Sequence, residues 1–295
     1  GSAVIVAPRG TESVSAANRI LVVRHPNDPF DRASYAIHAL SELWKARGIA
    51  VDVTQNPDEP TGDDVLVFPH LDLTVTPAKY RTFFDRCVRV VNRQVRDISK
   101  RLISRNLITA RSQYDGPVIV KTNRNAGGAP EASQAWHASG LRHRLAKAAS
   151  RLPWTVSARA GPEGYHIYDH PRDVPWIVWH NPRLVVEKFL PEREGDFYCL
   201  RQYVFLGSRE FNTRAVSPEP LVQARSVIRR EILDETPEAV RDVRRQLGFD
   251  YGKFDYVMRD GQAIIFDVNR TPSYNAQSKA GSAKSLIERL VCGMD

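Results

Sequence analysis

The sequence predicts a protein of mixed α/β and α+β class, with an N-terminal βαβ domain followed by two further subdomains. Three observations support this class. An apolar run, an amphipathic segment and a second apolar run occupy residues 20–53, at the lengths of a parallel βαβ unit. Later strand-like segments are joined by tight turns, as in antiparallel sheets. The 295 residues are long for one domain and suffice for two or three.

The opening unit follows from local apolar patterns. Ile20–Arg24 is a short run with β-branched residues, typical of a buried strand. Apolar residues recur at helical spacing over Ala33–Arg47, and Gly48 stands where a glycine commonly ends a helix. Apolar runs at Ile49–Val53 and Val65–Phe68 predict two more strands of the same parallel sheet.

The middle of the chain predicts strands separated by short helices. Asp97 is suited to be the N-cap of a helix that carries Lys100 and Leu107. Strands are expected at Cys87–Val91, Pro117–Lys121 and Leu184–Leu190, and a helix rich in Arg and Ala at Leu141–Leu152.

The last third predicts an antiparallel sheet with one helix. Thr236-Pro237-Glu238 is a strong helix start, with Thr as N-cap, Pro at the first position and an acid in the first turn. Gly248 would end that helix. A strand is expected at Phe197–Phe205, and a hairpin at Lys253–Met258 and Gln262–Asn269 with its turn at Arg259–Gly261.

These elements suggest the domain limits. We expect a loose arm over residues 1–18, which opens with Gly1-Ser2 as an expression scar. The βαβ domain then covers residues 19–85, a central subdomain residues 86–190, and a C-terminal subdomain residues 191–295.

Composition narrows the classes of function. Apolar residues make up 42% and charged residues 26%, which is ordinary for a globular protein. The net charge of +8 fits nucleic acid, an acidic membrane surface or an anionic small molecule. No aromatic residues are interleaved with the basic residues from Arg86 to Arg111, as a single-strand-binding platform requires. We therefore expect no nucleic-acid partner and favour anionic substrates.

Cysteine and apolar patterns indicate the compartment. Cys87, Cys199 and Cys292 are odd in number and far apart, which argues against a disulfide framework or a zinc site. A reducing, cytoplasmic location is expected. No apolar run approaches membrane-spanning length, so no membrane partner is expected.

Two features of the middle region suit a nucleotide. Lys121 ends an apolar strand directly before the loop Thr122–Pro130, so its ammonium group and the loop amides could surround phosphate oxygens. Its polar neighbours imply that truncating Lys121 costs little packing. The backbone of Glu187–Leu190 could recognise an adenine, and the acid Glu194 could accept ribose hydroxyls. Each feature alone is also common in turns and strand ends.

A third feature suits a divalent cation. Asp267 and Asn269 are two apart on one strand and share a face, and Asp255 lies on the preceding strand. Two carboxylates and an amide oxygen suit magnesium, which takes few protein ligands. Asp267 could equally lie on the solvent face of a half-exposed strand.

The register of the hairpin decides whether the three residues meet. A two-residue turn at Asp260-Gly261 would pair Asp255 with Phe266 and separate Asp255 from Asp267. We therefore expect a three-residue loop, which pairs Asp255 with Ile265, or else a bulge elsewhere in the hairpin. The apolar set would then occupy the other face: Phe254, Tyr256, Met258, Ile264, Phe266 and Val268.

Taken in order, these motifs resemble the ATP-grasp superfamily. The order is Lys100, Lys121 with its glycine loop, Glu187-Lys-Phe-Leu190, Asp255, and Asp267-Val-Asn-Arg-Thr-Pro272. The pattern is most similar to ligases that join carboxylates to amines, such as D-alanine–D-alanine ligases and ribosomal-protein glutamate ligases. The resemblance covers most of the chain and implies a pre-ATP-grasp domain followed by a two-subdomain ATP-grasp fold.

The resemblance implies roles for individual residues. ATP would be held by Lys100, Lys121, Gly127, Gly128, Glu187, Lys188, Phe189, Leu190 and Glu194. One or two Mg²⁺ ions would be held by Asp255, Asp267 and Asn269. Lys253 stands where D-alanine ligases have an arginine that stabilises the transferring phosphoryl group, and Arg201 and Arg214 are candidate clamps for a carboxylate or phosphate.

Two departures from the family pattern bear on the site. Asp267 stands where the family has a glutamate, so bridging of two ions is weaker, and the loop has only two glycines, Gly127 and Gly128. The implied function is an ATP-dependent ligase acting on small-molecule or peptide carboxylates and amines, and the resemblance allows a homodimer. An ATP-grasp kinase and a non-catalytic nucleotide or nucleic-acid binder are the alternatives.

Overall fold

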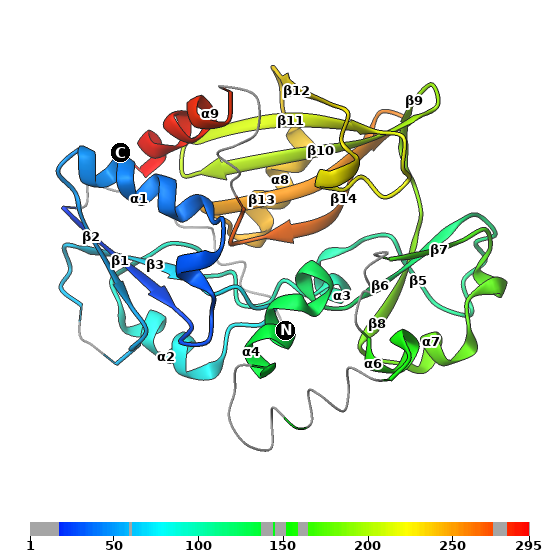
Figure 1. The fold of residues 1–295 in the computed structure, drawn as a ribbon, viewed down its shortest axis with the longest axis horizontal. Helices are drawn as coiled ribbons and strands as arrows, with labels where there is room; N and C mark the ends of the chain where they lie inside the picture. Colours follow the sequence, from blue (N-terminus) through cyan, green and yellow to red (C-terminus); the bar gives the residue numbers. More distant parts are fainter. Residues whose placement is uncertain are drawn as a thin grey trace, which may run out of the picture.

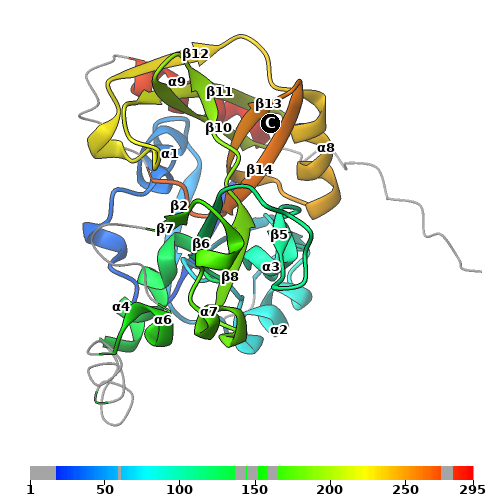
Figure 2. The same cartoon turned by 90° about the vertical axis from the view of Figure 1, so that its right-hand side faces the viewer.

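The structure is a computed structural model, and the residues that it describes form three β-sheets (Figure 1). It describes residues 18–58, 61–136, 144, 152–158, 165–273 and 282–294. In the side view, the strands of the largest sheet lie above those of the smaller antiparallel sheet (Figure 2). This mixed α/β and α+β architecture is the class that the sequence predicts. In the described part of the chain, no helix is long and apolar enough to cross a membrane.

The N-terminal sheet is parallel, with strand order β2-β1-β3-β4. Its strands are β1 (Arg19–Arg24), β2 (Ala50–Thr54), β3 (Val65–His70) and β4 (Arg89–Val90), and its helices are η1 (Phe30–Arg32), α1 (Ala36–Ala46) and α2 (Ala78–Arg86). The predicted βαβ unit is confirmed. The helix begins at Ala36 because Phe30–Arg32 form a separate 3₁₀ turn, and Gly48 follows it with the left-handed φ of 81°.

The core of this domain includes the C-terminal end of the chain. Trp44 of α1 is buried and lies in one apolar cluster with Leu290 and Val291, from α9 (Ser282–Leu290) and η5 (Val291–Met294). Leu206 and Tyr251 of the largest sheet belong to the same cluster. The N-terminal domain is therefore packed directly against the largest sheet.

The smaller antiparallel sheet has the order β5-β8-β6-β7. Its strands are β5 (Leu107–Ile108), β6 (Val118–Thr122), β7 (His166–Tyr168) and β8 (Leu184–Lys188); the accompanying helices are α3 (Lys100–Ile103), η2 (Asn125–Gly128), α4 (Ala129–Trp136), α6 (Trp154–Ser157), η3 (Pro171–Asp173) and α7 (Trp176–His180). The expected helix after Asp97 is a single turn capped at Ser99, because the chain extends into β5. Most of the helix expected at Leu141–Leu152 lies outside the described residues.

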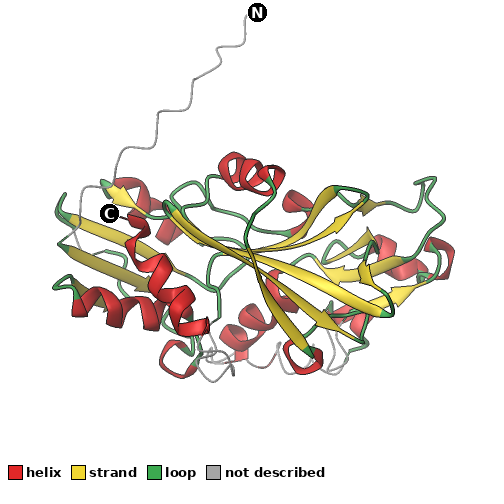
Figure 3. Ribbon diagram, turned by 90° about the horizontal axis from the view of Figure 1, so that it is seen from above, coloured by secondary structure: helices red, strands yellow, loops and turns green. Residues whose placement is uncertain are grey.

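The largest sheet has the order β12-β11-β10-β13-β14, with β9 also pairing with β10. Its strands are β9 (Glu192–Glu194), β10 (Phe197–Leu206), β11 (Arg209–Ser217), β12 (Arg229–Leu233), β13 (Tyr251–Arg259) and β14 (Gln262–Asn269), with η4 (Ala224–Ser226) before β12 and α8 (Glu238–Leu247) before β13. Seen from above, its long strands twist across the molecule (Figure 3). The expected helix start is confirmed within two residues, although the N-cap is Pro237 and no side chain caps the helix.

One face of the largest sheet is covered by α8. Val240 of that helix packs with Tyr203, Phe254 and Tyr256 in a buried cluster. These residues define a core face, and the side chains that alternate with them point to the opposite face. That opposite face carries the candidate site.

Candidate active site

A pocket of about 220 Å³ lies between the smaller and the largest sheet. Its lining comes from both sheets and from the connections β8–β9 and β11–β12. The polar lining residues include Lys100, Lys121, Tyr165, Glu187, Lys188, Gln223, Asp255 and Asp267, and the apolar ones include Ile119, Leu190, Leu221, Val257, Ile264 and Phe266. Eight of the sequence-predicted site residues therefore meet in one pocket: Lys100, Lys121, Glu187, Lys188, Phe189, Leu190, Asp255 and Asp267.

The hairpin turn differs from the expected three-residue loop. Arg259 pairs with Gln262, which leaves Asp260 and Gly261 as a two-residue turn. Their φ angles of 50° and 77° are both left-handed, as a type I′ turn requires. Asp-Gly is well suited to this turn because Asp tolerates left-handed backbone and glycine adopts it without steric cost.

The expected bulge is present instead, and it brings the acids together. Tyr256 pairs with Ile265, but the next pair is Asp255 with Asp267, so Phe266 is an extra residue on β14. Cross-strand partners share a face, so the two carboxylates lie side by side. Asn269 pairs with Lys253, two residues further along, and lies on the same face.

The bulge also changes which apolar residues face the core. Phe266 and Ile264 were expected on the core face, but both line the pocket. Ile265 packs against the core cluster in their place. The reason is that a bulge turns two successive residues, here Phe266 and Asp267, towards one side of the sheet.

Lys100 and Asp267 form one ion pair of the pocket. The Lys100 Nζ lies 2.7 Å from Asp267 Oδ1, and the lysine side chain is only 2% exposed. Burial by itself lowers the pKa of this ammonium group, but the nearby Asp267 carboxylate outweighs burial and the pKa is raised overall. Lys100 therefore stays charged at the edge of the pocket.

Lys121 and Glu187 form a second, more deeply buried pair. The Lys121 Nζ lies 2.6 Å from Glu187 Oε2, and the side chains are 6% and 1% exposed. The Phe266 ring lies 4.6 Å from the same ammonium group. Glu187 Oε1 is buried and has no hydrogen-bond partner among the described residues. The expectation that truncating Lys121 costs little packing is therefore wrong, because its side chain is buried against Glu187 and Phe266.

At the end of β8, some backbone N–H groups already donate hydrogen bonds within the protein. The N–H of Lys188 donates to Asn106 O at 2.9 Å, and the N–H of Phe189 donates to Pro117 O at 2.8 Å. Within the described part of the chain, the N–H of Leu190 makes no such bond, and Leu190 lines the pocket. Leu190 is thus a pocket residue of this segment whose N–H has no backbone partner among the described residues.

The glycine loop has an unusual backbone. Ala126, Gly127 and Gly128 have successive φ angles of 44°, 66° and 76°. Tyr165, which lines the pocket, is hydrogen-bonded to the backbone of Gly127, and burial raises the pKa of its phenol. Gly127 and Gly128 therefore lie next to the pocket, with backbone geometry that glycine permits.

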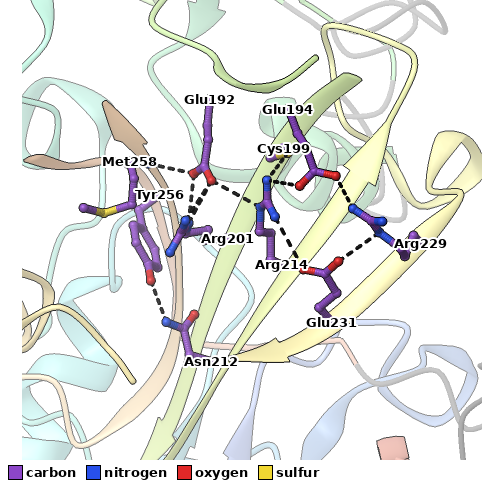
Figure 4. A network of polar contacts seen from close by, with 10 residues as sticks. All are labelled: Glu192, Glu194, Cys199, Arg201, Asn212, Arg214, Arg229, Glu231, Tyr256 and Met258. Atoms are coloured by element: carbon purple, nitrogen blue, oxygen red, sulfur yellow. Dashed lines mark hydrogen bonds and ion pairs between the residues drawn. The ribbon is translucent and has the colours of Figure 1, made fainter. Parts of the chain in front are cut away.

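Arg201 and Arg214 do not line the pocket. Arg201 pairs across the sheet with Tyr256, a core-face residue, and with Arg214. Arg201 makes a bidentate pair with Glu192, and Arg214 lies 3.2 Å from the same carboxylate. Figure 4 shows this arginine–glutamate network, which is formed by Arg201, Arg214, Arg229, Glu192, Glu194 and Glu231. Both arginines are held by protein carboxylates on the face away from Asp255.

Glu194 belongs to this network too. One oxygen pairs with Arg214 at 2.6 Å and the other with Arg229. The arginines lower the pKa of this carboxyl group. The structure therefore does not bring Glu194 together with the pocket residues that were expected to bind the nucleotide.

Two residues that do not line the pocket but connect to Asp255 were not predicted from the sequence. Gln202 pairs with Asp255 across the sheet, and its Nε2 donates to Asp255 Oδ1 at 3.1 Å. Arg230, an exposed residue of β12, donates to Gln202 Oε1 at 2.7 Å. Gln202 directly follows Arg201, so strand alternation could have indicated it once the facing of β10 was known.

The acids are chemically suited to a magnesium ion. Lys253 Nζ lies 3.3 Å from Asp255 Oδ2, and Lys100 Nζ is paired with Asp267 Oδ1. Each ammonium group thus occupies a position beside a carboxylate where a metal cation would also be stabilised. The Asn269 Oδ1 already accepts hydrogen bonds from the N–H and hydroxyl of Thr271. Residues 18–294, as far as described, hold no cluster of three or more His, Cys, Asp or Glu for a metal.

Comparison with solved structures identifies the fold as ATP-grasp. One structure of the ATP-grasp ligase PsnB, complexed with minimal precursor, superposes with a TM-score of 0.53 at 13% identity, over 93% of this chain and 99% of that one. Another, with minimal precursor, Mg and ADP, gives 0.53 at 12% identity over 98% and 100%. A RimK domain ATP-grasp protein from Sphaerobacter thermophilus gives 0.49 at 15% identity over 93% and 97%. No protein-family model and no curated protein matches the sequence.

Proposed function

We propose that the chain is an ATP- and magnesium-dependent ligase that activates a substrate carboxylate as an acyl phosphate for attack by an amine. One observation carries this proposal. Two buried lysines, Lys100 and Lys121, and the adjacent acids Asp255 and Asp267 line a single pocket between two sheets of an ATP-grasp fold. The similarity to PsnB, described as a ligase and solved with Mg and ADP, supports the same assignment.

The nucleotide would lie along the smaller sheet. Lys100 and Lys121 would bind the α- and β-phosphates, and the backbone of Gly127 and Gly128 would close over the triphosphate. The Leu190 N–H would bind the nucleobase, with Glu187, Lys188 and Phe189 beside it. We leave Glu194 out of the ribose site, because both of its oxygens are paired with arginines.

The large sheet would hold the reacting groups. Asp255 and Asp267 would hold Mg²⁺, which when bound neutralises charge on the phosphate oxygens. Lys253, beside Asp255, would stabilise the transferring phosphoryl group by its own charge. Arg230, exposed and joined to Asp255 through Gln202, would orient an anionic carboxylate substrate. Apolar lining residues such as Val257 and Ile264 exclude water, from which an acyl phosphate must be protected.

The substrates would be small-molecule or peptide carboxylates and amines. The net charge of +8 fits anionic substrates. The three free cysteines fit a reducing, cytoplasmic location. A homodimer stays a prediction from the resemblance.

The test is release of ADP with a panel of carboxylates and amines, with Asp267→Asn as the inactive control. A ligase forms ADP, inorganic phosphate and a new amide in equal amounts. A phosphorylated product without inorganic phosphate would assign a kinase instead. Absence of ATP binding to the folded protein would overturn the proposal.

A further inference from the structure

We infer that Glu131 is a positioning residue for the phosphate-binding loop Asn123–Gly128, and that it acts through Thr74 of the N-terminal domain. The inference rests on the proposed function, because it concerns how ATP is held. It joins three parts of the fold that are far apart in sequence: the connection after β3, the loop after β6, and the end of β14.

Thr74 connects Glu131 to the phosphate-binding loop through hydrogen bonds. Its N–H donates to Glu131 Oε1 at 2.8 Å, and its hydroxyl donates to the same oxygen at 2.5 Å. The same hydroxyl accepts the N–H of Asn125 at 2.9 Å. Thr74 is 4% exposed and Asn125 is 3% exposed, so water does not compete for these bonds. One hydroxyl thus connects the first residue of η2 to the carboxylate of α4.

Thr74 is also tied to the strand that carries the acids. Its carbonyl oxygen accepts from Arg270 Nη2 at 3.1 Å, and Arg270 directly follows Asn269. The buried Arg270 guanidinium donates as well to Leu73 O and, at 2.7 Å, to Thr76 Oγ1. The segment Leu73–Thr76 is therefore held to the end of β14 before it meets the phosphate-binding loop.

The backbone of the loop needs such a restraint. Ala126 has φ 44° and ψ 41°, a left-handed conformation that disfavours any residue with a Cβ. Asn125 is anchored immediately before it, and Glu131 holds α4 shortly after it. Glu131 lies in the first turn of α4 but binds Thr74, a residue of another domain. The left-handed turn is thus imposed by contacts outside the loop.

These contacts give Glu131 a defined part in ATP binding. Because Gly127 and Gly128 lie next to the pocket, a shift of Asn125 would move the amides that surround the phosphates. Carboxylate substrates, which bind on the side of Arg230, would be affected far less. The expected signature is therefore a change in the KM for ATP without a matching change in the KM for the carboxylate.

The experiment compares Glu131→Leu, which removes the acceptor oxygen, Thr74→Val, Thr74→Ser and the double variant Glu131→Leu/Thr74→Val. Steady-state kinetics and calorimetry with a non-hydrolysable ATP analogue and Mg²⁺ give the affinities. Each single disruptive variant should weaken ATP binding about tenfold, the double variant no more than either single one, and Thr74→Ser less than twofold. Glu238→Leu is the matched control, since Glu238 is also in the first turn of a helix but is far more exposed.

Amide hydrogen exchange tests the role of Glu131 even if a variant loses stability, because it reports on the loop directly. In the protein without nucleotide, amides 125–128 should exchange faster in Glu131→Leu than in the wild type, while those of β6 stay protected. Equal exchange and equal ATP affinity in a folded variant would overturn the inference. A wild-type protein that binds no ATP analogue would overturn the proposed function alone, because the exchange comparison needs no ligand.

Discussion

The pocket and the arginine–glutamate network both consist of ion pairs, but they are built differently. In the pocket, Lys121 meets one carboxylate, and an oxygen of Glu187 is buried with no partner among the described residues. In the network, Arg214 alone contacts three carboxylates, and Glu192 also accepts the N–H of Met258. The first arrangement leaves a carboxylate oxygen for a ligand. In the second, Arg214 Nε also makes no hydrogen bond among the described residues, but it lies 3.2 Å from the Glu192 carboxylate.

The difference teaches how to separate binding charges from structural ones. A buried charge with spare hydrogen-bonding capacity beside a pocket is costly unless a ligand or cation completes it. A guanidinium surrounded by carboxylates has its charge balanced within the protein and fixes neighbouring strands. Residue type and strand position look the same in both cases, so only the partners distinguish them.

The largest effect on both affinity and stability is expected from Lys121→Ala. The substitution leaves the Glu187 carboxylate buried without its cation, so the free energy of unfolding should fall by about 3–5 kcal/mol and ATP binding should be lost. Urea unfolding and calorimetry measure the two effects. Adding Glu187→Gln should restore part of the stability. A loss below about 1 kcal/mol would contradict a buried charge pair.

Asp267→Asn should reduce turnover about 100- to 1,000-fold while ATP binding stays measurable. The amide keeps the shape of the side chain but loses the charge that supports phosphoryl transfer. ADP release at saturating ATP and Mg²⁺ measures the effect. Asp260→Asn in the turn of the same hairpin is the control, because that side chain is 94% exposed. Equal turnover in the two variants would remove Asp267 from the site.

Gln202→Leu should lower kcat/KM about tenfold with little change in Tm. It removes the hydrogen bond to Asp255 and the acceptor for Arg230, a loss of about 1–1.5 kcal/mol. The matched control is Gln262→Leu, an exposed position at the start of β14. If both variants kept full activity, Gln202 would belong with the structural polar residues.

The smallest effect on turnover is expected from Arg214→Gln in the network. The kcat and the KM for ATP should change less than about twofold, while the free energy of unfolding falls by about 2 kcal/mol as charge-assisted hydrogen bonds are lost. Thermal unfolding and ATP kinetics on the same samples give both numbers. A collapse of turnover at unchanged Tm would break the distinction between the two regions and restore Arg214 as a catalytic candidate.

Local sequence patterns predicted many of the helices and strands of this structure. They could not predict which strands distant in sequence pair with each other. The strands Ile20–Arg24 and Gln262–Asn269 were predictable as strands, because their residue types follow one another along the chain. The bulge that turns Phe266 to the pocket was not located by alternation. Which face of the sheet Arg201 lies on depends on the pairing of β10 with β13, about fifty residues away. The alternation of side chains along β10 shows only that Arg201 and Gln202 lie on opposite faces, and it does not say which face is the core. Arg201 was proposed as a clamp from its charge and strand position alone, but the structure pairs it with Glu192 and places Gln202 beside Asp255. For Arg230, the sequence offered only its positive charge as an indication of a role near Asp255.

The bulge at Phe266 has a consequence for changes in chain length. A hairpin lacking Phe266 would pair evenly from its turn and still set Asp255 opposite Asp267, whereas one added residue would need a second bulge to do so. Codon deletion at this position should therefore be tolerated better than codon insertion. The shorter hairpin would lose the Phe266 ring, which lies over the Lys121 ammonium group. The extra residue of the bulge therefore adds an aromatic side chain to the pocket wall that regularly paired strands would not provide.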